Sequence, residues 1–140
     1  LRRGYGIDVI PLGPDAMARL VRAVTNRDIV CLLADRDLAG SGIEVELFGE
    51  TTTLPAGPAL LARRTGAPLL PTAVYYRSDG HRIGLVLPPI TADPTARLRP
   101  EVARVTQELA RALERLISAA PDQWHLLEPN WPSDRSPERG

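Results

Sequence analysis

The sequence has 140 residues, 44% of them apolar, and its 17 acidic residues balance 17 basic residues, all arginine. This length can bury one core and is too short for two ordinary domains. Zero net charge gives no support for a nucleic-acid partner, which requires a basic surface. No apolar stretch is long enough for a membrane span, and the lone Cys31 is expected to be a buried, unpaired thiol.

The first third of the chain predicts two strands with a helix between them. Residues 6–12 are β-branched and reach a proline, which favours a strand followed by a loop. Asp15 opens a helix with apolar residues at helical spacing. Residues 28–34 are apolar almost throughout, as in a strand covered on both faces of a parallel or mixed sheet. That strand would deliver residues 35–37 to its C-terminal end.

The rest of the chain predicts a half-exposed strand, a short helix, a hairpin and a long helix. An alternating strand is expected over residues 43–48, with both glutamates outward, and an extended segment over 51–55. A helix then runs from Pro58 to 64 and is ended by Thr65 and Gly66. A core strand over 67–77 pairs with 81–87, a linker covers 91–99, and the last helix runs from 100 to about 119.

Strands alternating with helices predict an α/β layered architecture, and the apolar run over residues 28–34 indicates a parallel or mixed sheet. Residues 1–131 are expected to form one domain or the C-terminal part of one, and the polar residues 132–140 a disordered tail. In such folds the site lies at the C-terminal ends of the strands. Residues 35–37 sit at such an end.

The segment around Asp35, Arg36 and Asp37 carries most of the polar chemistry, together with Glu50. The carboxylates of the two aspartates and Glu50 could supply oxygen ligands to a hard cation, but the guanidinium between the aspartates argues against a metal site. Arg36 has two open interpretations: a fork between carboxylates that holds the loop, or a group that binds phosphate or a developing oxyanion. Glu50 follows an apolar pair in a glycine-flanked turn, where a carboxylate can orient a histidine.

Other candidate motifs are weaker. The glycines around Ser41 are too few for a nucleotide fingerprint. His81 and His125 have no evident acid or nucleophile partner in the sequence, so both are expected to be structural.

Four ordered blocks carry a family resemblance. They are residues 33–38 with 48–50, residues 54–59, residues 65–71, and residues 121–124. On these blocks the chain resembles the bacterial lipid acyltransferases of the lipid A lauroyl/myristoyl type, and within them the actinobacterial phosphatidylinositol mannoside acyltransferases. The resemblance covers roughly residues 5–131.

The resemblance implies the C-terminal part of a glycerol-phosphate-acyltransferase-like α/β fold, which is a mixed, largely parallel sheet wrapped by helices. It also implies an enzyme at the cytoplasmic face of the plasma membrane. Such an enzyme transfers a palmitoyl-like chain from acyl-CoA, a co-substrate, to a mannose hydroxyl, and needs no cofactor. The family's catalytic histidine precedes an aspartate by five residues, a spacing that neither His81 nor His125 has. We therefore expect that histidine upstream of Leu1, and these 140 residues alone to be inactive.

By position, the resemblance makes Glu50 the residue that orients the missing histidine. It places Asp35, Arg36 and Asp37 beside the substrate, with Gly57 and Pro58 shaping the wall at a helix N-terminus that favours anions. Arg63, Arg64 and Arg77 are either phosphate contacts or ordinary surface arginines. Two other functions stay open: acylation of another glycolipid such as a lipid A precursor, and a non-catalytic lipid- or phosphate-binding module.

Overall fold

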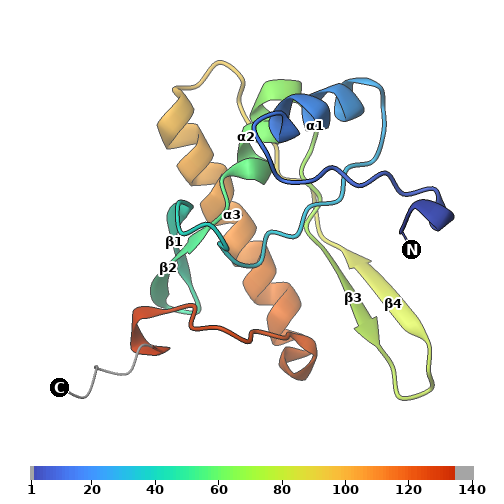
Figure 1. The fold of residues 1–140 in the computed structure, drawn as a ribbon. Helices are drawn as coiled ribbons and strands as arrows, with labels where there is room; N and C mark the ends of the chain where they lie inside the picture. Colours follow the sequence, from blue (N-terminus) through green and yellow to red (C-terminus); the bar gives the residue numbers. More distant parts are fainter. Residues whose placement is uncertain (1, 135–140) are drawn as a thin grey trace.

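The computed structural model describes residues 2–134, which contain three α-helices and two separate two-stranded antiparallel sheets. The helices are α1 (Ala16–Thr25), α2 (Gly57–Thr65) and α3 (Leu98–Ser118), and the strands are β1 (Ile43–Leu47), β2 (Glu50–Leu54), β3 (Thr72–Tyr76) and β4 (Arg82–Val86). Short 3-10 helices are η1 (Arg2–Tyr5), η2 (Pro121–Gln123) and η3 (Pro132–Asp134). In Figure 1 the long helix α3 runs through the middle, with α1 and α2 at one end and the β3–β4 hairpin projecting to one side.

Helix α3 supplies most of the core, as its predicted apolar stripe requires. Val102, Val105 and Leu109 form one buried cluster with Ala59 of α2 and Ile90. A second cluster joins Ala110 of α3 to three residues of the β1–β2 hairpin, which are Val45, Leu47 and Leu54. Each such valine or leucine contributes roughly 1.5–3 kcal/mol on burial. The helix therefore fixes the position of the hairpin relative to α2.

The alternating pattern over residues 43–48 correctly predicted strand β1. Val45 and Leu47 are buried, whereas Glu44 and Glu46 are exposed. The backbone of Glu46 is also held from outside the sheet, because the Gln107 side chain accepts from its N–H and donates to its carbonyl, both over 2.9 Å. A side-chain amide of α3 thus occupies the open edge of β1.

Helix α1 begins directly after Asp15, as predicted, although the Asp15 side chain makes no capping hydrogen bond. Helix α2 ends at Gly66, whose φ of 70° is left-handed and whose N–H donates to the carbonyl of Ala62 over 2.8 Å. That conformation suits glycine because it has no Cβ. The predicted long helix begins two residues earlier than its proline suggested and ends at Ser118.

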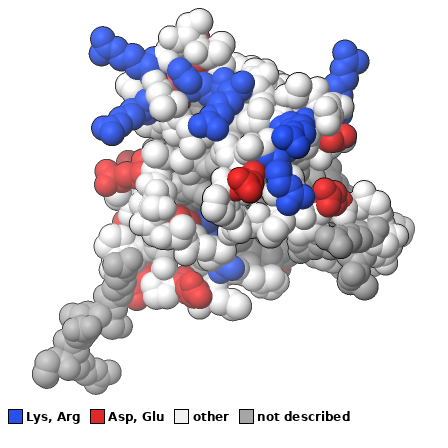
Figure 2. Space-filling view, turned by 45° about the horizontal axis from the view of Figure 1, so that its top comes forward, with Lys and Arg blue, Asp and Glu red and all other residues white. Residues whose placement is uncertain are grey.

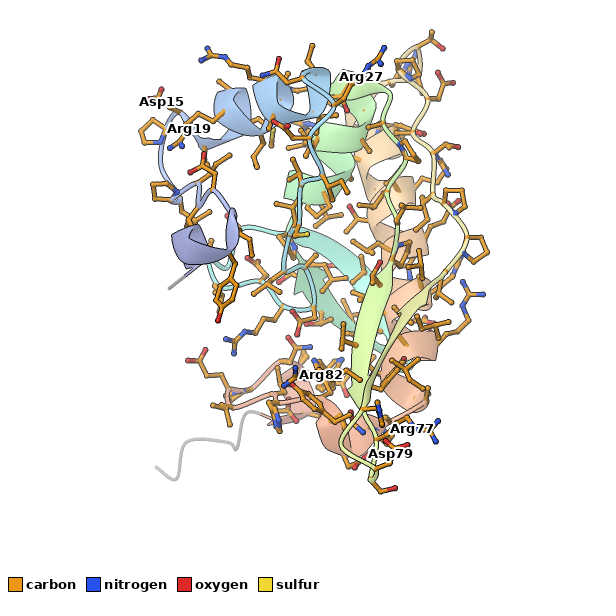
Figure 3. The ribbon with its side chains drawn as sticks, turned by 90° about the vertical axis from the view of Figure 1, so that its right-hand side faces the viewer. Asp15, Arg19, Arg27, Arg77, Asp79 and Arg82 are labelled. Atoms are coloured by element: carbon orange, nitrogen blue, oxygen red, sulfur yellow. The ribbon has the colours of Figure 1, made fainter. Side chains whose placement is uncertain are left out.

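The predicted hairpin over residues 67–87 is present as β3–β4, but it is not a core element. Strand β3 alternates between half-buried and exposed residues, and β4 is exposed throughout. One anchor is Tyr75, whose hydroxyl donates to the carbonyl of Leu116 over 2.7 Å. Arg77 and Asp79 lie at the tip, joined over 3.0 Å (Figure 3).

The largely parallel sheet predicted from the sequence is not found in residues 2–134. Neither 6–12 nor 28–34 forms a strand there. Residues 28–34 instead alternate along an unpaired segment: Ile29 and Leu33 are 93% and 92% exposed, while the residues between them are largely half-buried. Cys31 is exposed, contrary to the prediction. A strand needs neighbours for its backbone groups, and none pairs with this segment in the described part of the chain.

Candidate active site

Glu50 is presented by a tight turn with unusual backbone geometry. Leu47 pairs with Glu50 across the hairpin, so Phe48 and Gly49 are the two turn residues. Their φ angles are 54° and 78°, the left-handed values that a type I′ turn requires. A phenylalanine in that region is strained, which the surroundings must offset. The Phe48 N–H donates to the carboxylate of Glu114 on α3, and this bond helps to hold the turn.

The carboxylate of Glu50 is anchored at both oxygens. The backbone N–H of Ser133 donates to Oε1 over 2.9 Å, and the Ser133 hydroxyl donates to Oε2 over 2.7 Å. Glu50 itself is half-buried. Each carboxylate oxygen has two lone pairs, so Glu50 retains capacity to accept a further N–H donor.

Asp37 organises the loop between residues 35 and 42. Its carboxylate accepts the N–H groups of Ala39 and Gly40, each over 3.1 Å, and that of Gly42 over 2.6 Å. The Thr53 hydroxyl of β2 donates to it over 3.0 Å. Burial raises the pKa of Asp37, but these hydrogen bonds, first that of Gly42, outweigh it and the pKa falls below its ordinary value. Asp37 thus stays ionised and ties the loop to β2.

Gly42 closes the same loop because no side chain fits there. A Cβ on this residue would lie 2.4 Å from the carbonyl oxygen of Leu54 and 2.7 Å from Oδ2 of Asp37. The contact with Leu54 is to backbone, which cannot swing away. The glycine at this position is therefore a packing requirement.

Asp35 joins the loop to an aromatic cluster. The indole N–H of Trp124 donates to Oδ2 of Asp35 over 3.0 Å. The rings of Trp124, Trp131 and Phe48 form a triangle with centroids 6.1–6.3 Å apart. Because Phe48 is the turn residue two before Glu50, this cluster connects Asp35 to the turn that carries Glu50.

Arg36 does not form a fork with the carboxylates beside it. Among the residues that the structure describes, it makes no ion pair with Asp35 or Asp37, whose carboxylates accept from Trp124 and from the loop instead. The side chain is half-buried. Of the two interpretations of Arg36, the loop-holding fork is wrong, and binding of an anionic ligand stays a prediction.

Gly57 and Pro58 begin α2, as predicted, and Pro58 is buried. The N-cap residue Ala56 makes no side-chain capping hydrogen bond. Ala56, which precedes Gly57, and Ala34, which precedes Asp35, pack against the same buried cluster. The start of α2 and the loop of Asp35 therefore border one part of the core.

The remaining candidates have ordinary surroundings. Arg63 donates to the carbonyl of Ala96 over 2.8 Å, Arg77 pairs with Asp79, and Arg64 is exposed. His81 lies at the hairpin tip with Nδ1 3.2 Å from Asp79. His125 is exposed, and neither histidine is hydrogen-bonded to Glu50 within residues 2–134. In the same range no three acidic, histidine or cysteine side chains gather as a metal site would need.

Several positions around Glu50 and Asp35 were not predicted from the sequence as site residues. The sequence predicts a tail that includes Ser133, and Trp124 lies in one of the four blocks that carry the resemblance. Gln123, its neighbour, accepts from the N–H of Tyr76 over 2.7 Å and donates to its carbonyl over 3.0 Å. The usable signal was composition: two tryptophans near the end of the folded part indicate packing, because buried indoles seek partners.

Comparison with known proteins agrees with the resemblance. Residues 1–133 match the sequence profile of a family described as bacterial lipid A biosynthesis acyltransferase. The chain is 40% identical over 141 residues to a phosphatidylinositol mannoside acyltransferase of Mycobacterium tuberculosis (strain ATCC 25618 / H37Rv), and 40% identical over 144 residues to one of Mycolicibacterium smegmatis. These matches cover 99% of this chain but 43% and 44% of the two relatives, so the chain spans less than half of their length. The chain belongs to the bacterial lipid A biosynthesis acyltransferase family.

Proposed function

We propose that this chain carries the glutamate side of the active site of an acyltransferase. The enzyme would move a palmitoyl-like chain from acyl-CoA to a mannose hydroxyl of a phosphatidylinositol mannoside, with no cofactor. The observation that carries the proposal is the 40% identity, over 99% of the chain, to proteins named phosphatidylinositol mannoside acyltransferase. The carboxylate of Glu50, held at both oxygens by Ser133, supports the proposal as a candidate catalytic group.

In the proposed reaction a histidine outside this chain takes the proton of the mannose hydroxyl. The oxygen then attacks the thioester carbonyl, a C–O bond forms, and the C–S bond to coenzyme A breaks. The proton passes from the imidazolium to the leaving thiolate. Glu50 accepts the other imidazole N–H, fixes the ring and stabilises its cation, a role for which a held carboxylate is suited. General-base assistance of this kind is worth roughly 10²–10⁴-fold, so residues 1–140 alone should be inactive.

The polar loop and α2 would bind the anionic parts of the substrates. Arg36 has no carboxylate partner among the described residues and is half-buried beside Asp35, which supports a role with a phosphate. Asp35 and Asp37 would hold that loop in shape through Trp124 and Gly42. The uncapped start of α2 at Gly57 and Pro58 offers a partial positive charge.

The rest of the protein would complete the fold. Residues 28–34 are extended and apolar, with Ile29 and Leu33 almost fully exposed and no strand beside them within residues 2–134. We propose that strands outside this chain pair with them and form the parallel sheet of a glycerol-phosphate-acyltransferase-like fold. That pairing would place the missing histidine near Glu50.

A peripheral position at the cytoplasmic face of the plasma membrane is part of the proposal. None of the helices in the described range has the length and apolarity to cross a bilayer. Exposed arginines line the end of the molecule where α1 packs on α2 and α2 on α3; they are Arg19, Arg22, Arg27, Arg64, Arg97 and Arg99. Figure 2 shows basic side chains spread over this end, and Figure 3 places Arg19 and Arg27 along α1 and just after it. Such a surface favours anionic headgroups.

Two alternatives have specific support. The family description favours acylation of a lipid A precursor. The guanidinium of Arg36, which has no carboxylate partner among the described residues, is compatible with a non-catalytic lipid- or phosphate-binding module. The proposals differ in whether a thioester is cleaved and in which acceptor gains the acyl chain.

The test is transfer of labelled palmitate by the intact protein. Palmitoyl-CoA is supplied with a phosphatidylinositol mannoside, with a lipid A precursor, or with no acceptor. The proposal predicts a labelled mannoside and acceptor-dependent release of coenzyme A. Label on the lipid A precursor alone would favour the first alternative, and substrate binding without thioester cleavage the second.

A further inference from the structure

Residues 130–134 form a strap across the β1–β2 hairpin. The Thr52 hydroxyl donates to the carbonyl of Asn130, and the Trp131 indole N–H donates to the carbonyl of Leu47 over 3.1 Å. The carboxylate of Asp134 closes the strap on itself by accepting the N–H groups of Asn130 and Trp131 over 2.9 and 3.0 Å. In Figure 1 this C-terminal segment lies against the end of the hairpin. The strap therefore has a defined shape and a defined place beside the turn of Glu50.

The strap reaches Glu50 through one residue. Ser133 gives its backbone N–H to one carboxylate oxygen and its hydroxyl to the other, over 2.9 and 2.7 Å. A glutamate side chain rotates about three bonds and loses conformational entropy when it is held in one rotamer. Two donors from a single residue fix the plane of the carboxylate as well as its position. Charge-assisted bonds of this kind are among the stronger ones in proteins.

We propose that Ser133 is a positioning residue: it holds the carboxylate of Glu50 in the orientation that an incoming imidazole N–H requires. This inference rests on the proposed function, because it assigns Ser133 to act through Glu50. The inference also goes beyond the proposed function, because no step of the proposed chemistry requires the strap of residues 130–134. The remaining lone pairs on both oxygens leave Glu50 free to bind the imidazole while Ser133 stays bound.

The test compares Ser133→Ala, which loses the hydroxyl donor, with Ser133→Thr, which keeps it. Acyl transfer by the intact protein is measured at saturating and limiting palmitoyl-CoA. We expect Ser133→Ala to lower kcat about tenfold with KM nearly unchanged, as for loss of one hydrogen bond to a charged group. Ser133→Thr should recover most of kcat. Ser118→Ala, at the exposed end of α3, is the matched control and should resemble the wild type.

A second arm separates positioning from simple stabilisation. If Ser133 acts through Glu50, then Ser133→Ala lowers kcat in the wild type and leaves the residual kcat of Glu50→Gln unchanged. An equal loss in both backgrounds would overturn the inference, because the effect would then bypass Glu50. Wild-type kcat in Ser133→Ala, with a strongly reduced kcat in Glu50→Gln, would also overturn it while leaving the proposed function intact. No transfer by the wild-type protein, or full transfer by Glu50→Gln, would remove the basis of both.

Discussion

Replacing Gly42 by alanine tests how tightly the loop of Asp37 is packed on β2. The added Cβ would lie 2.4 Å from the backbone oxygen of Leu54 and 2.8 Å from its carbonyl carbon, far inside contact distance. Leu54 is fully buried and shares a cluster with Val45 and Leu47, so β2 cannot retreat without opening the core. The loop must move instead, and that movement stretches the 2.6 Å bond from Gly42 to Asp37.

The expected cost of Gly42→Ala combines two effects. Overpacking typically costs about 1–3 kcal/mol, and weakening one hydrogen bond about 1 kcal/mol, which gives about 2–4 kcal/mol. Urea unfolding of the intact protein, with unchanged m value, measures the free energy of unfolding. Gly84→Ala is the control, because its Cβ meets no atom within 4 Å and should change stability by less than about 0.5 kcal/mol. A loss below about 0.5 kcal/mol for Gly42→Ala would refute the packing argument.

Three further predictions concern other contacts. The ion pair with Arg104 lowers the pKa of Glu101 from 4.5 to about 2, so Glu101 stabilises the fold above pH 4.5 and loses this effect as the pH falls toward 2. The difference in unfolding free energy between wild type and Glu101→Gln should therefore shrink on acidification through that window, and a constant difference would contradict the assignment. Trp124→Phe keeps a ring but removes the donor to Asp35, and should cost about 0.5–1.5 kcal/mol by urea unfolding. An equal further cost in an Asp35→Ala background, which has no acceptor, would show that the bond is not responsible. Leu109→Ala, at a position 4% exposed, should cost about 2–5 kcal/mol by the same measurement, and a cost under 1 kcal/mol would show that this side of α3 is not core.

Local patterns predicted the helices and hairpins well because their causes lie close together in the sequence. The alternation around Val45 and Leu47 reflects burial of one face, and Gly66 ends α2 through its own backbone conformation. The helix α3 was predictable because its apolar stripe meets two buried clusters. Each of these signals needs only neighbours within about one element.

Local sequence pattern alone could not predict whether a parallel sheet forms. The apolar run over residues 28–34 indicates a strand, but a strand forms only where another backbone pairs with it, and Ile29 and Leu33 remain exposed. Similar reasoning explains the exposed Cys31. A prediction of burial from hydrophobicity assumes that other residues pack over the apolar side chain. The local sequence pattern does not show whether such residues are present.

The candidate site was predicted only in part because its contacts are long-range. Glu50 and Asp37 were singled out by their turns and neighbours, but their partners lie elsewhere along the chain. Ser133 is separated from Glu50 by 83 residues, and Trp124 from Asp35 by 89. Nothing in the polar composition of residues 132–140 distinguishes Ser133 from a solvated serine. Only the fold brings these residues together.

The most direct test of the central claim is acyl transfer by the intact protein and its Glu50→Gln variant, with Glu46→Gln as control. Both glutamates lie on the same hairpin, but Glu46 is exposed and its side chain makes no hydrogen bond with the described residues, whereas both oxygens of Glu50 are bound by Ser133. The account predicts that Glu50→Gln, correctly folded, loses most of its transfer from palmitoyl-CoA to the mannoside and that Glu46→Gln retains it. Equal transfer by the wild type and Glu50→Gln would contradict the placement of Glu50 in the active site.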